Sequence, residues 1–364
     1  MTWRVGVLGA TGAVGQKMIR GLAGHPWFRI AEVAASERSS GRSYREAARW
    51  MQECAIPDEA ADLEVKGVTP DLDCDFVLSA LDSNVAGPVE EDFARAGYPV
   101  ISNTRNHRMD EDVPLVIPEV NPEHLNLIAR QKERRGYTSG YLVTNPNCST
   151  VGLAMALKPL EDAFGVAEVF VVTMQALSGA GYPGVASLDA MENVIPFIGG
   201  EEEKMQSEPR KILGRLAQNA IQFAEIKISA QCNRVPVIDG HLESVSVKLK
   251  RRASAADVSE ALASFTGEPQ KLGLPTAPAH PILVSSEEDR PQPRRDRDAG
   301  RGMSVSVGRI RPCGLADFKF TVLVHNTIRG AAGAAILNAE LLADRGMLPH
   351  RGRVEDSVVA RKQV

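Results

Sequence analysis

A chain of 364 residues exceeds the size at which one hydrophobic core usually stops growing, about 250–300 residues, so two domains with a cleft between them are expected. The composition, 43% hydrophobic and 24% charged, is that of a globular protein and excludes global disorder. A net charge of −4 provides no overall basic field, which argues against nucleic acid or a membrane surface as a partner.

The cysteines and the N-terminus give two further expectations. Five cysteines are widely spaced, odd in number and without a CxxC pair, which disfavours a disulfide framework and a zinc site. No metal is therefore expected, and there is room for one reactive thiol. The apolar run at the N-terminus is too short for a signal peptide or a membrane span, which predicts a cytoplasmic protein.

The first elements in chain order predict a strand, a tight turn and a helix. An apolar run at 4–8 leads into glycines at 9, 12 and 15, after which apolar residues recur with helical spacing. Segments long enough for crossover helices, such as 85–96, separate the next strand-like runs, which lie at 30–34, 76–80, 99–102 and 142–144. Repeated βα units imply an α/β fold with a Rossmann-like, doubly wound parallel sheet.

The pattern changes after residue 150. The run at 168–174 and the alternating run at 242–249 predict strands of a sheet with one solvent-facing side, in a second, α+β domain. A charged stretch rich in Pro and Gly at 287–302 predicts a long surface loop or a partner-contacting arm. A strand at 318–324 and an alanine-rich helix at 329–344 follow. We expect a first domain at 1–148, completed by the C-terminal segment 326–364, and a second domain at 149–325.

The glycine turn has the spacing GxxGxxG instead of the usual GxGxxG. The physical requirement is the same: a tight turn, close approach of the backbone to a pyrophosphate, and a helix N-terminus directed at its charge. A purely structural glycine turn is the alternative, but the position between a strand and a helix favours dinucleotide binding. The expected cofactor contacts in this turn are Gly9, Thr11, Gly12, Ala13, Val14 and Gly15.

The segment after the second strand bears on the choice of cofactor. Ser36, Arg38 and Ser39 stand where an arginine can accept the 2′-phosphate of NADP, which favours NADP over NAD. Glu37 could instead bind the ribose hydroxyls, and Arg38 could be a solvated surface charge. Ser79, in the third strand-like run, is a further expected cofactor contact.

The sequence YLVTNPNCST at 141–150 places a cysteine after a strand and a Pro-Asn break, directly before a helix-like run. Cys148 is therefore expected at a helix N-terminus. There the helix dipole and free backbone amides lower the pKa of a thiol and can stabilise an oxyanion on the attached carbon. The other four cysteines are expected to be small buried hydrophobic residues.

These motifs resemble a known family. The sequence NPNCST at 145–150 resembles the active-site signature of aspartate-semialdehyde dehydrogenase, and GATGAVG at 9–15 is similar to the cofactor loop of that family. The resemblance runs over nearly the whole chain, and the block at 106–121 resembles the archaeal and fungal branch.

The resemblance implies a reaction and a division of labour between the domains. The reaction is NADPH-dependent reductive dephosphorylation of L-aspartyl 4-phosphate to L-aspartate 4-semialdehyde through a thioacyl intermediate on Cys148. Its products serve lysine, threonine, methionine and isoleucine biosynthesis. The first domain would bind NADP, and the second would carry catalysis and the contacts of a homodimer or homotetramer.

Arg234 and His241 flank Gly240 just before the alternating strand, so both side chains can face one cleft. The resemblance implies that His241 is the general acid/base, for which an ordinary pKa near ~6.5 is suitable. It also implies that Arg234 binds the substrate α-carboxylate, because a planar guanidinium fits a carboxylate better than an ammonium does.

Glu208 and Lys211 lie on one face of a helix-like run, and taken alone they indicate a solvent-exposed ion pair. The resemblance implies that Glu208 binds the substrate amino group, while Lys211 and Arg108 bind the phosphate. It further implies that Gln175 orients the acyl group, with Asn147 as another substrate contact. Asn326 resembles the residue that holds the nicotinamide, although a helix N-cap is the alternative.

Three other functions stay open. Malonyl-CoA reductases share the fold and the nucleophile, as do N-acetylglutamyl-phosphate reductases, whose nucleophile motif usually has Gly where this chain has Asn147. A non-catalytic NADP-binding regulatory protein is the third. The presence of Cys148, Arg234 and His241 together argues against it, because a regulatory protein has no need of all three.

Overall fold

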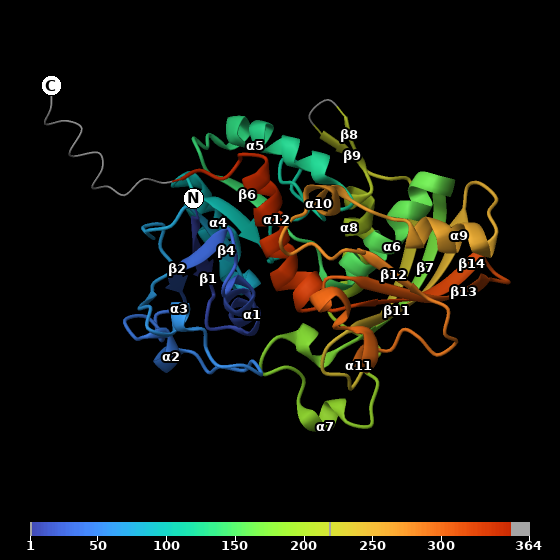
Figure 1. The fold of residues 1–364 in the computed structure, drawn as a ribbon, viewed down its shortest axis with the longest axis horizontal. Helices are drawn as coiled ribbons and strands as arrows, with labels where there is room; N and C mark the ends of the chain where they lie inside the picture. Colours follow the sequence, from blue (N-terminus) through green and yellow to red (C-terminus); the bar gives the residue numbers. More distant parts are fainter. Residues whose placement is uncertain (1, 218–219, 351–364) are drawn as a thin grey trace, which may run out of the picture.

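The computed structural model describes residues 2–217 and 220–350. In this part of the chain, two six-stranded sheets form the framework of the protein (Figure 1). The first sheet is parallel throughout and has the order β3-β2-β1-β4-β5-β6. Its strands are β1 (Trp3–Leu8), β2 (Phe28–Ala34), β3 (Val65–Lys66), β4 (Phe76–Ser79), β5 (Pro99–Ser102) and β6 (Tyr141–Thr144). This confirms the expected doubly wound α/β fold.

Helices cover both faces of the first sheet. One core cluster packs α1 and α12 against inward side chains of β1 such as Val5 and Val7, and a second places Phe93 of α4 against the other face. The expected crossover helix at 85–96 is α4. The helices of this half are α1 (Ala13–Leu22), α2 (Tyr44–Ala47), α3 (Asp58–Ala61), α4 (Ser83–Arg95), the 3₁₀ turn η1 (Pro122–Asn126) and α5 (Leu127–Arg135).

The second sheet is mixed and has the order β10-β7-β11-β14-β13-β12. Buried side chains alternate along β11, as the sequence predicts for a sheet with one solvent-facing side. The strands of this sheet are β7 (Val166–Gln175), β10 (Lys227–Arg234), β11 (His241–Leu249), β12 (Ile282–Ser285), β13 (Val305–Pro312) and β14 (Phe318–Val324). A separate hairpin consists of β8 (Arg215–Ala217) and β9 (Ala220–Gln222).

The helix α6 (Cys148–Phe164) packs on the buried face of this sheet and shares a core cluster with it. The charged stretch at 287–302 contains two helical turns, so it is more ordered than a plain loop. Besides α6, the helical elements of this half are η2 (Leu177–Ala180), α7 (Ser187–Ala190), α8 (Glu201–Ile212), α9 (Ala255–Ala263), α10 (Glu268–Leu272), α11 (Pro293–Asp296) and η3 (Ala299–Gly302).

The C-terminal segment packs in the core cluster of the first sheet. The π-helical turn η4 (Ile328–Ala332) leads into α12 (Gly333–Asp344), which lies in the middle of Figure 1 and packs on α1. Glu340 of α12 accepts hydrogen bonds from His25 in the first half and from the backbone of Thr276 in the second. The part of the expected segment beyond residue 350 lies outside the described residues, and the boundaries at 148 and 325 stay predictions.

None of the helices in the described part of the chain combines the length and apolar character that crossing a bilayer requires.

Candidate active site

Cys148 is the first residue of α6, as the sequence predicts. The preceding residue, Asn147, is the N-cap, and its side-chain oxygen accepts hydrogen bonds from the backbone amides of Ser149 (3.0 Å) and Thr150 (3.3 Å). These two amides are therefore engaged by the cap. An oxyanion at an acyl carbon on Cys148 has to be stabilised largely by other donors.

His241 begins β11 and faces the thiol. Its Nε2 atom lies 3.2 Å from the Cys148 sulfur, and its Nδ1 atom accepts a hydrogen bond from the backbone amide of Ala176 (3.0 Å). Because Nδ1 is an acceptor, the neutral ring carries its proton on Nε2, directed at the sulfur. An imidazolium would place an N–H at Nδ1 against the Ala176 N–H, which disfavours the charged form.

Burial changes both groups of this pair. It raises the pKa of the Cys148 thiol to about 12, with the Glu201 carboxylate acting in the same direction. It lowers the pKa of His241 to about 3, and the Arg234 guanidinium adds to this effect. The expected lowering of the thiol pKa by the helix N-terminus is therefore outweighed by desolvation, and the ordinary histidine pKa does not apply.

Arg234 ends β10 beside Gln175, the last residue of β7. One guanidinium nitrogen of Arg234 donates to the backbone carbonyl of Ala176 (2.7 Å). A Cβ atom at Gly179 would stand 2.8 Å from Arg234 and 2.9 Å from His241, so a larger residue there would displace one of these side chains. The structure thus brings Arg234 and His241 to one place, as their positions around Gly240 predict.

Gln175 reaches across to the nucleophile helix. Its side-chain nitrogen donates to the Ser149 hydroxyl (2.6 Å) and to the carboxylate of Glu201 (3.2 Å). Both of its N–H bonds are engaged, which leaves the amide oxygen as the group with free hydrogen-bonding capacity.

Arg108 and Glu208 form a buried ion pair. One guanidinium nitrogen of Arg108 donates to Glu208 (3.0 Å), and another donates to the carbonyl of Asn103 (2.8 Å). The second oxygen of Glu208 accepts from the backbone amide of Asn147 (2.7 Å). A carboxylate offers about four lone-pair sites, so Glu208 retains capacity for a substrate amino group. Glu208 is therefore buried and paired with Arg108, and does not form the solvent-exposed pair with Lys211 that the helical spacing alone indicates.

Lys211 lies in the interior on α8. Its ammonium donates to the carbonyls of Arg108 (2.7 Å), Asp110 (2.7 Å) and Val113 (2.8 Å), and burial lowers its pKa to about 8. Since an ammonium has three donors, a direct bond to phosphate requires Lys211 to give up one carbonyl. Its evident task is to hold the loop that carries Arg108.

The glycine turn fits a dinucleotide. Gly9 has φ +74°, and a Cβ atom there would stand 2.5 Å from the Ala80 carbonyl. Gly12 is exposed at the N-cap of α1 and has no side chain to cap the helix. The first backbone amides of α1 are therefore open to an anionic ligand. Thr11, Ala13, Val14 and Gly15 complete this turn, where a pyrophosphate would bind.

The expected 2′-phosphate site lies beside this turn. Ser36 and Arg38 are exposed and Ser39 is half-buried, in a turn directly after β2, whose last residue, Ala34, accepts hydrogen bonds from the amides of Gly9 and Ala10. Ser79 differs from this open loop, because it is fully buried and its hydroxyl donates to Glu90 (2.6 Å). While that bond exists, the Ser79 hydroxyl cannot donate a hydrogen bond to a cofactor.

Asn326 lies one residue before the N-cap of η4, Thr327, so it is not the cap itself. Its oxygen accepts from the backbone amide of Gly240 (2.8 Å), and its nitrogen donates to the Ser178 hydroxyl (2.8 Å). Asn326 thus holds the turn before His241 in place, next to the expected nicotinamide site.

A cleft of about 900 Å³ lies beside the start of α1 and the segment before His241. Ala13 and Val14 at the start of α1 form one wall of the cleft. Ser178, Asp239 and His325, from the half that contains the second sheet, form another. Cys148 and His241 do not line this cleft, which ends at Asp239 in the turn before His241.

Some functional residues do not follow from the motifs. Glu201 contacts both Asn147 and Gln175, Ala176 sets the His241 tautomer, and a Cβ atom at Gly330 would stand 2.7 Å from the Cβ of Cys148. Gly330 follows Asn326 closely in the motif HNTIRGAA, which is the one sequence signal that could have indicated it.

A glycine-rich turn on a parallel sheet, together with a cysteine–histidine pair at the start of α6 and β11, is the arrangement of a nicotinamide-dependent dehydrogenase with a candidate cysteine nucleophile. The comparisons with known proteins agree. The family described as "Semialdehyde dehydrogenase, NAD binding domain" matches residues 4–128, and "Semialdehyde dehydrogenase, dimerisation domain" matches residues 157–329.

Relatives of this chain share one name. The aspartate-semialdehyde dehydrogenase of Archaeoglobus fulgidus is 56% identical, covering 94% of this chain and 98% of that one, and the protein of Schizosaccharomyces pombe is 49% identical over 95% and 99%. The crystal structure of the Candida albicans enzyme with NADP has a TM-score of 0.88 at 44% identity, covering 96% of this chain and 100% of that one. The chain belongs to the aspartate-semialdehyde dehydrogenase family.

Proposed function

We propose that the protein catalyses the NADPH-dependent conversion of L-aspartyl 4-phosphate to L-aspartate 4-semialdehyde and phosphate. The observation that carries this proposal is the Cys148 sulfur at the head of α6, 3.2 Å from His241 and within the electrostatic influence of Arg108 and Arg234. The identity of the substrate is inferred from membership of the aspartate-semialdehyde dehydrogenase family. The biosynthetic pathways to lysine, threonine, methionine and isoleucine would use the product.

NADPH, when bound, supplies the hydride that reduces the acyl group. The amides at the head of α1, with Gly9, Gly12 and Gly15, would hold its pyrophosphate, and Arg38 with Ser36 and Ser39 would hold its 2′-phosphate. Asn326 supports the nicotinamide end through the turn that it fixes at Gly240.

Cys148 is the nucleophile in this account. The thiol first releases its proton to solvent. The thiolate then attacks the acyl carbon, a carbon–sulfur bond forms, and the carbon–oxygen bond to phosphate breaks with its electron pair going to the phosphate. Arg108 offsets the charge of the leaving phosphate, and Lys211 supports it by holding the Arg108 loop and by its own positive charge. After reduction, collapse of the adduct releases the aldehyde and restores the thiolate.

The remaining residues position the substrate and handle the proton. Arg234 binds the α-carboxylate with the nitrogens that Ala176 leaves free, and Glu208 binds the amino group. Gln175, with Asn147 nearby, orients the acyl group through its amide oxygen. His241 is the acid/base: its Nε2–H donates to the thiolate and to the developing oxyanion, and for the ring to take up a proton it must release the Ala176 amide from Nδ1.

An assay of the purified protein separates this function from its alternatives. We expect NADPH formation from aspartate semialdehyde, phosphate and NADP, and none when phosphate is omitted in steady state. Malonyl-CoA with NADPH is run beside it, and robust turnover there would instead favour a malonyl-CoA reductase. No reaction with either substrate, together with tight NADPH binding, would favour a regulatory protein.

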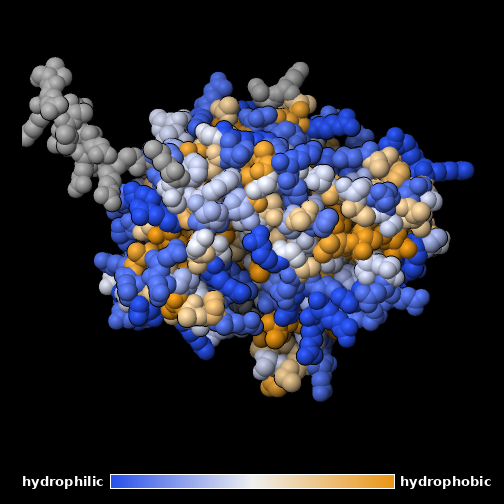
Figure 2. Space-filling view, viewed as in Figure 1, coloured by the Kyte–Doolittle hydropathy of each residue, from blue (hydrophilic) through white to orange (hydrophobic). Residues whose placement is uncertain are grey.

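The matched dimerisation domain makes this an oligomeric family, and we infer a homodimer or homotetramer for this chain. The segment around α7 projects at the bottom of the view in Figure 1, and Figure 2 shows apolar surface there. In this segment the side chains of Leu188 and Met191 are 91% and 66% exposed. We propose that a second copy covers part of this surface. Light scattering of the parent and of Leu188→Asp would show whether the oligomer depends on this surface.

The cytoplasmic location also stays a proposal, which cell fractionation would test.

A further inference from the structure

Glu201 is a buried carboxylate that the reaction above does not use. It is the first residue of α8, only 7% of its surface is exposed, and it lies against the residue that precedes the nucleophile. A buried carboxylate is costly unless it is paired and hydrogen-bonded. Its position beside the reacting thiol therefore requires an explanation.

The partners of Glu201 belong to the nucleophile's surroundings. The side-chain nitrogen of Asn147 donates to both of its oxygens (2.9 and 3.2 Å), and that of Gln175 donates to Oε2 (3.2 Å). Asn147 caps the helix that Cys148 begins, and Gln175 bonds to the Ser149 hydroxyl. One carboxylate thus joins the helix cap, the acyl-orienting amide and α8.

Lys204 balances the charge of Glu201. Its ammonium forms an ion pair with Oε1 one helical turn away. Although burial acts against ionisation, this ammonium and the hydrogen bonds from Asn147 and Gln175 keep the pKa of Glu201 below its ordinary value. Glu201 is therefore an anion next to a group that must itself become an anion.

Four charged side chains have the largest effect on the Cys148 thiol, and Glu208 beside them is paired with Arg108. Glu201 opposes the thiolate, while Arg108, Arg234 and Lys204 favour it, and His241 is neutral and donates from Nε2. Removing the anion and removing its lysine partner should therefore move the thiol pKa in opposite directions.

We propose that Glu201 is a positioning residue of the nucleophile, which fixes the helix cap Asn147 and the Ser149 partner Gln175 while Lys204 offsets its charge. The catalytic part of this inference rests on the proposed function, whereas the electrostatic part concerns the thiol alone. In the aspartyl phosphate reaction, Glu201 acts through Gln175 on the acyl group and through the Asn147 cap on the direction of the sulfur.

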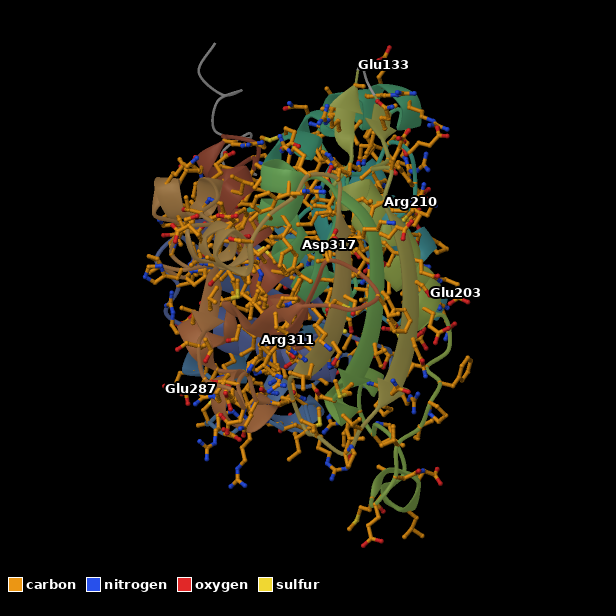
Figure 3. All side chains as sticks on the ribbon, turned by 90° about the vertical axis from the view of Figure 1, so that its right-hand side faces the viewer. Glu133, Glu203, Arg210, Glu287, Arg311 and Asp317 are labelled. Carbon is orange, nitrogen blue, oxygen red and sulfur yellow. The ribbon has the colours of Figure 1, made fainter. Side chains whose placement is uncertain are left out.

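The test uses Glu201→Gln, Lys204→Met and a matched control, Glu203→Gln, in the full chain. Glu203 lies on the same helix with its side chain exposed and directed outward (Figure 3). The rate of iodoacetamide alkylation is followed against pH by mass spectrometry of the Cys148 peptide, which separates it from the exposed Cys54. This readout needs no substrate, so it succeeds or fails independently of the proposed function.

Glu201→Gln should raise the alkylation rate several-fold at a given pH below the thiol pKa, and Lys204→Met should reduce it, with Glu203→Gln unchanged. Shifts in the same direction for both variants, or no shift in either, would overturn the proposal, because loosened packing cannot produce opposite signs.

The positioning role is read from kinetics. A glutamine keeps one acceptor and turns an N–H toward Asn147 or Gln175, so kcat with aspartate semialdehyde, phosphate and NADP should fall by about 10–10²-fold. The affinity for NADPH should not change. An unchanged kcat in Glu201→Gln would contradict the positioning role even if the thiol pKa moves.

Discussion

The Nε2 atom of His241 lies 3.2 Å from the sulfur of Cys148, although 93 residues separate the two in the chain. The histidine begins a strand of the second sheet and the cysteine begins the helix that packs on that sheet. Burial disfavours a charge on either residue, so the structure favours a neutral thiol beside a neutral imidazole over a preformed thiolate–imidazolium pair.

The first prediction concerns the pH dependence of Cys148 alkylation in the free protein. The pKa of the thiol is raised to about 12, so the thiolate fraction should increase about tenfold per pH unit throughout pH 7–10. No plateau should appear near the ordinary cysteine pKa of about 8.5. Because the pKa of His241 is lowered to about 3, no step near pH 6.5 is expected either. A plateau below pH 8 would show that the pair is ionised.

The second prediction tests the carboxylate clamp. Arg234→Lys keeps the charge but loses the planar fork, and misplacing the acyl carbon by about 1 Å can reduce the rate by about 10²-fold. We expect a fall of that order in kcat/KM for aspartate semialdehyde. Lys227→Arg, at the exposed start of the same strand, is the control and should be neutral. Full activity of Arg234→Lys would assign the carboxylate to another group.

The third prediction concerns cofactor choice. Arg38 is exposed beside the glycine turn, where its guanidinium can pair with a 2′-phosphate that NADH lacks. Arg38→Ala should therefore lower the ratio of kcat/KM for NADPH to kcat/KM for NADH by about tenfold or more. This is the size of effect expected from the loss of one charge-assisted hydrogen bond. Steady-state kinetics with both cofactors provide the measurement, with Arg45→Ala as a nearby exposed control. Unchanged discrimination would place the phosphate site elsewhere.

The fourth prediction concerns stability. Arg329 of η4 and Glu119 form a bidentate ion pair in which both side chains are buried. Removing one partner leaves an unpaired buried charge, so Arg329→Met should lower the free energy of unfolding by about 3–5 kcal/mol in urea. Arg134→Met, in an exposed pair with Glu111, should change it by less than about 1 kcal/mol. Similar effects of the two variants would contradict the assignment.

Local sequence patterns were sufficient to predict much of the fold and the positions of Cys148 and His241 at the start of a helix and of a strand. The strand, Pro-Asn break and helix-like run around Cys148 predict a cysteine at a helix N-terminus, and the alternating run after Gly240 predicts the strand that His241 begins. These features depend on residues close in sequence, whose spacing carries the information. The doubly wound sheet follows in the same way from repeated βα units.

Tertiary contacts set the parts that the patterns missed. Glu201 lies in the run EEEK, which is typical of a solvated helix start, and only packing against Asn147 makes it part of the site. The partners of Lys211 are backbone carbonyls, which leave no signature in a sequence. Desolvation of Cys148 reverses the expected direction of its pKa shift, because burial depends on the whole fold.

The central claim, a thioacyl intermediate on Cys148, is tested most directly by incubating the protein with aspartate semialdehyde and NADP in the absence of phosphate. Hydride transfer then produces the thioester, which has no phosphate to attack it. We predict a burst of NADPH stoichiometric with active sites and an aspartyl adduct on the Cys148 peptide by mass spectrometry, both lost in Cys148→Ala. A burst that leaves Cys148 unmodified, or an adduct on another residue, would contradict the account.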